Sequence, residues 1–208
     1  MDEIPYVDDR TWGVAGGLIA FDVALTVAAV SNGQLAHGSS PTLVAWDLAK
    51  GIAIVLLLIS GSTRHRSPGL AGFGCLFLLI ALVDGLAIHS PIAHWISDLV
   101  PWAVLDIRPA DGQGIAELAV LLVLGLSAAI VVARLGGWQG LSATRQALWV
   151  LVIGLGFFAI AIDLVDHLTD LQGRWSMLEE GGEGVLLSLA LAYSWQVWQR
   201  SLSMPESR

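Results

Sequence analysis

Six long apolar runs constrain the fold of this 208-residue chain more than any other feature. A run of about 20 apolar residues is long enough for a helix to cross a hydrocarbon core of about 30 Å. The pattern therefore predicts an all-α membrane protein, a bundle of six transmembrane helices. The runs cover approximately residues 12–30, 42–59, 70–88, 115–132, 148–165 and 184–198, the last of which we expect to extend back to Glu179 or Glu180.

Composition agrees with a membrane protein. Hydrophobic residues make up 55% of the chain and charged residues 13%, whereas a soluble domain carries about 25% charged residues. We expect one integral membrane domain over residues 1–208, with short tails at 1–11 and 201–208. The acidic N-terminal tail lacks the basic region of a cleavable signal, so the first run should remain as a helix. A net charge of −8 argues against a nucleic-acid surface.

The arginines indicate the orientation of the bundle. If both termini lie on one side, the other side receives only Arg108 and Arg174. By the positive-inside rule we expect both termini in the cytoplasm and the protein in the plasma membrane, with the lipid bilayer as its surroundings. Tryptophans, Trp46 among them at the outer boundary, fit two interfacial belts. The arginines on the side of the termini are Arg10, Arg64, Arg66, Arg134, Arg145, Arg200 and Arg208.

This orientation collects the ionisable residues of the apolar runs in the outer third of the membrane, except Asp22, which lies near the middle of the first run. A charged side chain at the bilayer centre costs about 2.5 to 3.5 kcal/mol on insertion scales, so each position is a functional candidate. Most of these candidates are carboxylates and histidines.

The clearest constellation is the turn between the fifth and sixth runs. Asp163, Asp166 and His167 stand at i, i+3 and i+4, so they share one helical face, and Glu180 and Glu183 share a face of the next helix. Carboxylate and imidazole ligands on facing helices hold transition metals in bundle proteins. The pattern predicts a divalent cation site for Zn, Mn or Fe. The alternative is that some of these groups only solvate a loop at the membrane surface.

Asp84, His89 and Glu117 are candidates to complete this metal site. Asp84 and His89 are five positions apart and do not share a face on an unbroken helix, so they form no metal motif alone. Glu117 has no partner nearby in the sequence. Each of the three is equally compatible with a position at the membrane interface.

Asp47 and Lys50 stand at i and i+3, a spacing that allows an ion pair within one helix. Lys50 is the only lysine of the chain. Asp22 has no local partner and therefore needs one from another helix, or must be neutral. These three residues are either a proton or ion path or a self-neutralising group. The GGEG segment before the sixth run predicts close helix approach.

The sequence also suggests an internal repeat of three related hairpins. Each has an apolar helix that ends in a carboxylate and a return helix that ends in arginine. The alternative is that any hairpin obeying the positive-inside rule acquires this pattern.

Three function classes stay open: a metal-binding protein, including a membrane-embedded metal-dependent hydrolase; a proton- or ion-coupled transporter; and a non-catalytic subunit with a membrane protein partner or in a homo-oligomer. Nucleophile-elbow, zincin, P-loop and dinucleotide motifs are absent from the sequence.

Overall fold

The computed structural model describes residues 7–32, 40–86, 88–102, 109–137, 143–158 and 175–203, and within these ranges every regular element is a helix. The all-α prediction is confirmed for this part of the chain. The α-helices are α1 (Asp9–Ser31), α2 (Pro41–His65), α3 (Pro68–Gly85), α4 (His89–Leu99), α5 (Pro109–Val132), α6 (Ala143–Phe157) and α8 (Trp175–Ser203), and the π-helical turn η2 (Ala133–Gly137) continues α5.

Three helical segments are long and apolar enough to cross a membrane by length and composition: Asp9–Ser31, Pro41–His65 and Gly112–Leu135. They coincide with the first, second and fourth predicted runs. Two further apolar helices, Pro68–Val83 and Ala143–Phe157, are shorter, and the last part of the fifth run lies outside the described residues. The structure therefore indicates a membrane helix bundle.

The third and sixth runs differ from the prediction at their ends. The third was expected to continue to residue 88, but α3 ends at Gly85 and a separate helix, α4, begins at His89. Glycine at the end of a helix and Pro91 shortly after it explain the break. The sixth run extends back to Trp175, further than the glutamates at which we expected it to start.

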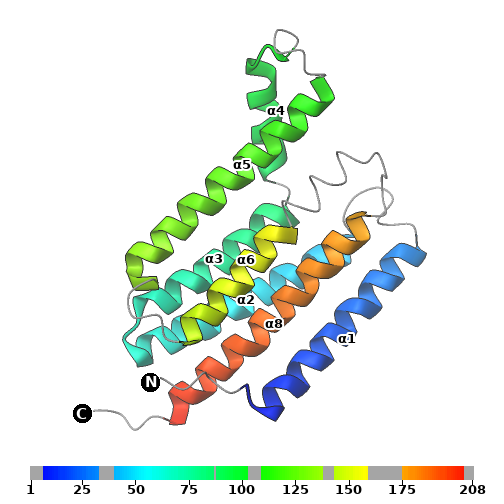
Figure 1. The fold of residues 1–208 in the computed structure, drawn as a ribbon. Helices are drawn as coiled ribbons and strands as arrows, with labels where there is room; N and C mark the ends of the chain where they lie inside the picture. The colour runs from blue at the N-terminus through cyan, green and yellow to red at the C-terminus, as the bar shows by residue number, and fades with distance from the viewer. Residues whose placement is uncertain are drawn as a thin grey trace.

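The long helices alternate in direction (Figure 1): α1, α3 and α6 run one way, and α2, α5 and α8 run the other. The start of α1 and the end of α8 consequently lie at the same end of the bundle. The described arginines gather at this end, because each belongs to the first turn or the last turns of a helix that begins or ends there: Arg10, Arg64, Arg66, Arg134, Arg145 and Arg200.

The apolar core lies between α2, α3, α6 and α8. Ile54, Leu58, Phe73 and Phe77 are buried there, and the Phe73 ring meets the ring of Trp149 edge to face at 5.0 Å. Glycine lets α2 and α3 approach closely, since a Cβ at Gly74 would lie 3.1 Å from the Cα of Val55. A separate small cluster of Ala93, Ala116 and Val120 joins α4 to α5.

Helix α1 packs mainly against α8, whereas α2 packs against both α3 and α8. Figure 1 shows α1 at one edge of the bundle, beside α8. The first predicted hairpin, made of α1 and α2, is therefore not a closely packed pair. The other two predicted hairpins do pack as pairs, α3 against α5 with η2 and α6 against α8, and the threefold repeat stays a prediction.

Candidate functional site

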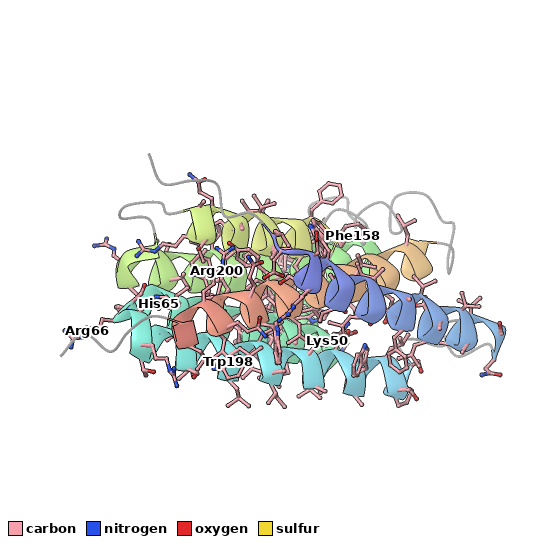
Figure 2. All side chains as sticks on the ribbon, turned by 90° about the horizontal axis from the view of Figure 1, so that it is seen from below. Lys50, His65, Arg66, Phe158, Trp198 and Arg200 are labelled. Carbon is pink, nitrogen blue, oxygen red and sulfur yellow. The ribbon has the colours of Figure 1, made fainter. Side chains whose placement is uncertain are left out.

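A buried group of charged side chains joins α1, α2 and α8. Lys50, about 1% exposed, lies in the interior near the middle of the bundle (Figure 2). Its Nζ lies 3.0 Å from Asp22 Oδ1, 2.6 Å from Asp47 Oδ1 and 2.9 Å from the carbonyl oxygen of Gly184. The ammonium donates hydrogen bonds to Asp22 and to the Gly184 carbonyl, and it forms an ion pair with Asp47. We call Asp22, Lys50 and Asp47 the charge cluster.

Asp22 accepts hydrogen bonds on both carboxylate oxygens. The indole Nε1 of Trp46 donates to Oδ1 at 2.6 Å, the oxygen that also faces Lys50, and the Ser188 hydroxyl donates to Oδ2 at 2.5 Å. Only 3% of Asp22 is exposed. Donors from α2 and α8 therefore replace the water that this carboxylate loses on burial, as a buried charge requires.

The charge cluster lies deep within the bundle. The rise from Pro41 to Lys50 along α2, and from Asp22 to Ser31 along α1, is about 13 Å at 1.5 Å per residue. Lys50 was expected in the outer third and Asp22 near the middle of its run, but the structure pairs them directly, so the two side chains lie at the same level of the bundle. The membrane depth of this level stays a prediction.

Local packing fixes the geometry of the cluster. The Trp46 ring meets Phe21 edge to face at 5.0 Å, and Lys50 Nζ lies 5.7 Å from the Trp46 ring centroid, within the range of a cation–π contact. Gly184 has no side chain, and a Cβ there would stand 3.7 Å from both Asp22 Cγ and Lys50 Nζ. This is an ordinary van der Waals distance, so the close helix approach predicted for the GGEG segment stays a prediction, while the Gly184 carbonyl does reach the ammonium.

The cluster contains two carboxylates and one ammonium, so it has one excess negative charge when all three groups are ionised. The members of the cluster differ in the exposed fraction of their side chains. The side chain of Asp47 is 17% exposed, compared with 4% for Asp22 and 1% for Lys50. Asp47 is therefore the most exposed member of the cluster.

Two sequence predictions about this cluster are confirmed. Asp47 and Lys50 form the predicted i, i+3 ion pair, and Asp22 obtains its partner from another helix. The sequence did not identify Ser188 or the Gly184 carbonyl, and it assigned Trp46 only to an interfacial belt. A tryptophan directly before Asp47 was the one available signal.

The remaining described candidates lie in two places. Glu183, 7% exposed, precedes Gly184 in α8, and Glu180 is half-buried one turn earlier. His89 and Glu117 instead line a mostly apolar cavity of about 510 Å³ between α3, α5 and α6. Glu117 Oε1 accepts from Ser90 Oγ and Gln113 Nε2, both at 3.3 Å, and His89 Nδ1 lies 3.2 Å from a backbone carbonyl.

The central members of the predicted metal site, Asp163, Asp166 and His167, lie outside the described residues, as does the side chain of Asp84. In the described part of the chain, no three His, Cys, Asp or Glu side chains are grouped closely enough to hold a metal ion. The metal site thus stays a prediction that depends on residues 163–167.

The arrangement around Lys50 is suited to binding one small cation, because one excess negative charge is held in a site that few water molecules can enter. A proton on a carboxylate, or a monovalent metal ion beside it, would neutralise the cluster. No protein-family model, curated protein or solved structure matches this chain.

Proposed function

We propose that this chain is a multi-pass membrane transporter that couples the binding of a proton or a monovalent cation at the charge cluster to movement of an ion or solute. The observation that carries this proposal is the sharing of one buried ammonium, Lys50, between two carboxylates of long apolar helices, at a level that we expect to lie deep in the membrane. Charged residues at that depth are costly, and in membrane proteins they commonly belong to ion or proton pathways.

The cycle we propose has two states. With Asp47 ionised, Lys50 is shared between Asp47 and Asp22; with Asp47 protonated or paired to a cation, Lys50 pairs with Asp22 alone. The ammonium also contacts Gly184 of α8, so a change in its partners alters how α2 is held against α8. Ligand binding can drive transport only if the two states bind the ligand with different affinities.

The same proposal includes six membrane spans in the plasma membrane, with both termini in the cytoplasm. Its support is the alternation of the six long helices and the concentration of arginines at the end where α1 begins. Attachment of a membrane-impermeant reagent to single cysteines placed in the α2–α3 turn and in α4 would test it. Labelling of α4 alone from outside intact cells is the expected result.

The transport proposal is tested in proteoliposomes. We expect an imposed pH or Na⁺ gradient to drive flux through the wild-type protein, reported by a trapped pH dye or by ²²Na⁺. Asp22→Asn and Asp47→Asn should abolish the flux. Asp98→Asn is the matched control, because Asp98 is an exposed carboxylate on α4, away from the cluster. Absence of wild-type flux for both ions, or full flux in Asp47→Asn, would refute the proposal.

A divalent cation site, with metal-dependent hydrolysis as its chemistry, is kept as a second proposal for the residues predicted from sequence. It is favoured by the position of His89 and Glu117 in the wall of one cavity, which could accept part of an amphiphile. Metal analysis of the purified protein tests it: stoichiometric Zn, Mn or Fe lost in Asp163→Ala and His167→Ala supports the site. A metal-free native protein that also fails to bind added metal would exclude it.

A further inference from the structure

We propose that a cavity of about 330 Å³ at the arginine-rich end of the bundle binds a phosphate group. This site is separate from the charge cluster, and Figure 2 places His65 and Arg200 at the end of the bundle, well away from Lys50. The polar side chains that line the cavity come from the α2–α3 turn, α6 and α8: His65, Ser67, Thr144, Arg145, Tyr193, Gln196 and Arg200.

The ionisable lining is cationic. Two guanidinium groups, Arg145 and Arg200, face the same cavity as the His65 imidazole, and no carboxylate occurs among its described lining residues. Arg145 and Arg200 also interact with other groups of the chain. After the hydrogen bonds from Thr11, the charge of Arg200 helps to lower the pKa of Asp8, so an anion in the cavity would share these guanidinium groups with existing partners. Arginine is the side chain best shaped for phosphate, because its planar fork donates two parallel hydrogen bonds to two oxygens.

The lining also supplies neutral hydrogen-bond donors. Tyr193 and Gln196 of α8 are 8% and 2% exposed, and they line the same cavity as Thr144 of α6. Hydroxyl and amide groups beside two guanidiniums can complete the coordination of the several oxygens that a phosphate presents.

The rim of the cavity is held by the short α2–α3 turn. Ser62 Oγ donates to the carbonyl oxygen of Ser67 at 2.8 Å, and the backbone N–H of Leu70 donates to the same carbonyl at 3.0 Å. Arg66 has a left-handed backbone with φ of 49°, which ends α2 sharply. The helices α3 and α6 also begin here, so the positive ends of two helix dipoles add to the field of the arginines.

The cavity wall further includes Leu70 and Val197, which can contact an organic group attached to the phosphate. Basic pockets between membrane helices at the cytoplasmic side characteristically receive phospholipid head groups. The shared chemistry is a phosphate group, and its two sources are an anionic lipid head group and free phosphate.

The experiment compares four forms of the full-length protein: wild type, Arg145→Gln/Arg200→Gln, Arg145→Lys/Arg200→Lys and Arg64→Gln. Arg64 is the matched control, since it is an exposed arginine in the last turn of α2 and does not line the cavity. Inorganic phosphate binding is measured in detergent by thermal shift against chloride of equal ionic strength. Lipid binding is measured by native mass spectrometry after incorporation into nanodiscs containing phosphatidylglycerol and phosphatidylcholine.

We expect the wild type and Arg64→Gln to bind phosphate, phosphatidylglycerol or both. Loss of two charge-assisted contacts should weaken binding about 100-fold in the double glutamine variant, with the double lysine variant in between. Binding of phosphate alone would assign a soluble ligand, and binding of phosphatidylglycerol alone would assign a lipid. No binding of either, or equal losses in Arg64→Gln and the double glutamine variant, would overturn the proposal. Unchanged melting temperatures without ligand show that the variants are folded.

Discussion

The interface of α1, α2 and α8 contains the carboxylate of Asp22, and the contact between α4 and α5 contains that of Glu117, which, contrary to the sequence prediction, has a partner four positions away in Gln113. Asp22 is 3% exposed and is held by an ammonium, an indole and a hydroxyl from two other helices. Glu117 is half-buried and is held by one hydroxyl and one amide at the longer distance of 3.3 Å. Deep burial therefore goes together with a charged partner, while a shallower carboxylate is satisfied by neutral donors.

The difference follows from the cost of losing water. A fully buried carboxylate keeps its charge only if protein groups replace its hydration, and a cation does this most effectively. A partly exposed carboxylate keeps some contact with its surroundings and tolerates weaker bonds. Four predictions test this contrast, and they are ordered by the size of the expected effect.

Lys50→Met should have the largest effect. Methionine retains most of the volume of the side chain but leaves Asp22 buried without a cation, which should lower the free energy of unfolding by about 3–5 kcal/mol. Reversible unfolding in mixed micelles, followed by circular dichroism, measures the change. Addition of Asp22→Asn should recover part of the loss, and a Lys50→Met protein as stable as the wild type would refute the assignment of the ion pair.

Ser188→Ala and Ser90→Ala compare the two carboxylates directly, since each removes one hydroxyl donor. Loss of the Ser188 bond to the buried Asp22 should cost about 1.5–3 kcal/mol, whereas loss of the longer Ser90 bond to Glu117 should cost about 0.5–1.5 kcal/mol. The same unfolding assay compares them. Equal costs would contradict the link between burial and bond strength.

Glu117→Gln should cost about 1 kcal/mol or less, because the amide oxygen of glutamine can still accept from Ser90 and Gln113. Asp22→Asn, measured in parallel, should cost more, since the amide loses its charge beside Lys50. A larger loss for Glu117→Gln than for Asp22→Asn would reverse the comparison.

The smallest effect is expected at Asp8, a half-buried carboxylate that caps α1. Its Oδ1 accepts the backbone N–H of Thr11 at 2.7 Å, and hydrogen bonds from Thr11 hold the pKa of Asp8 below the ordinary value of 3.8. A lowered pKa in the folded state means that the cap stabilises α1 above pH 3.8 and that this stabilisation is lost as the pH falls through the folded pKa. Amide hydrogen exchange in the first turn should therefore accelerate at acidic pH, and Asp8→Asn should remove this dependence.

The sequence predicted the helices well because each apolar run has a length and composition that only a helix suits in a membrane. It did not predict α4, since the third run was expected to continue to residue 88 and no separate helix was expected at 89–99, where Pro91 is accepted in the first turn. It could not predict that α1 packs against α8. Lipid-facing and core-facing surfaces of these helices are both apolar, so hydrophobicity does not specify which surfaces meet.

The charge cluster was predictable only where its members are close in sequence. Spacing alone identified the Asp47 and Lys50 pair, whereas Asp22 and Lys50 are separated by 28 positions and join only through tertiary packing. The carbonyl oxygen of Gly184 has no residue-specific signature, since every residue carries one. A serine in an apolar helix, such as Ser188, is equally compatible with packing and with hydrogen bonding.

The hydrogen bond from Ser188 to Asp22 spans 166 positions of the chain, which has a consequence for biosynthesis. At a synthesis rate of about 5 to 20 residues per second, the ribosome produces Ser188 roughly ten to thirty seconds after Asp22. For most of that interval α1 and α2 are complete, but α8, which provides most of the contacts of α1, has not yet been synthesised. The final position of α1 is therefore set at the end of translation, so helix insertion and completion of the bundle are separate events.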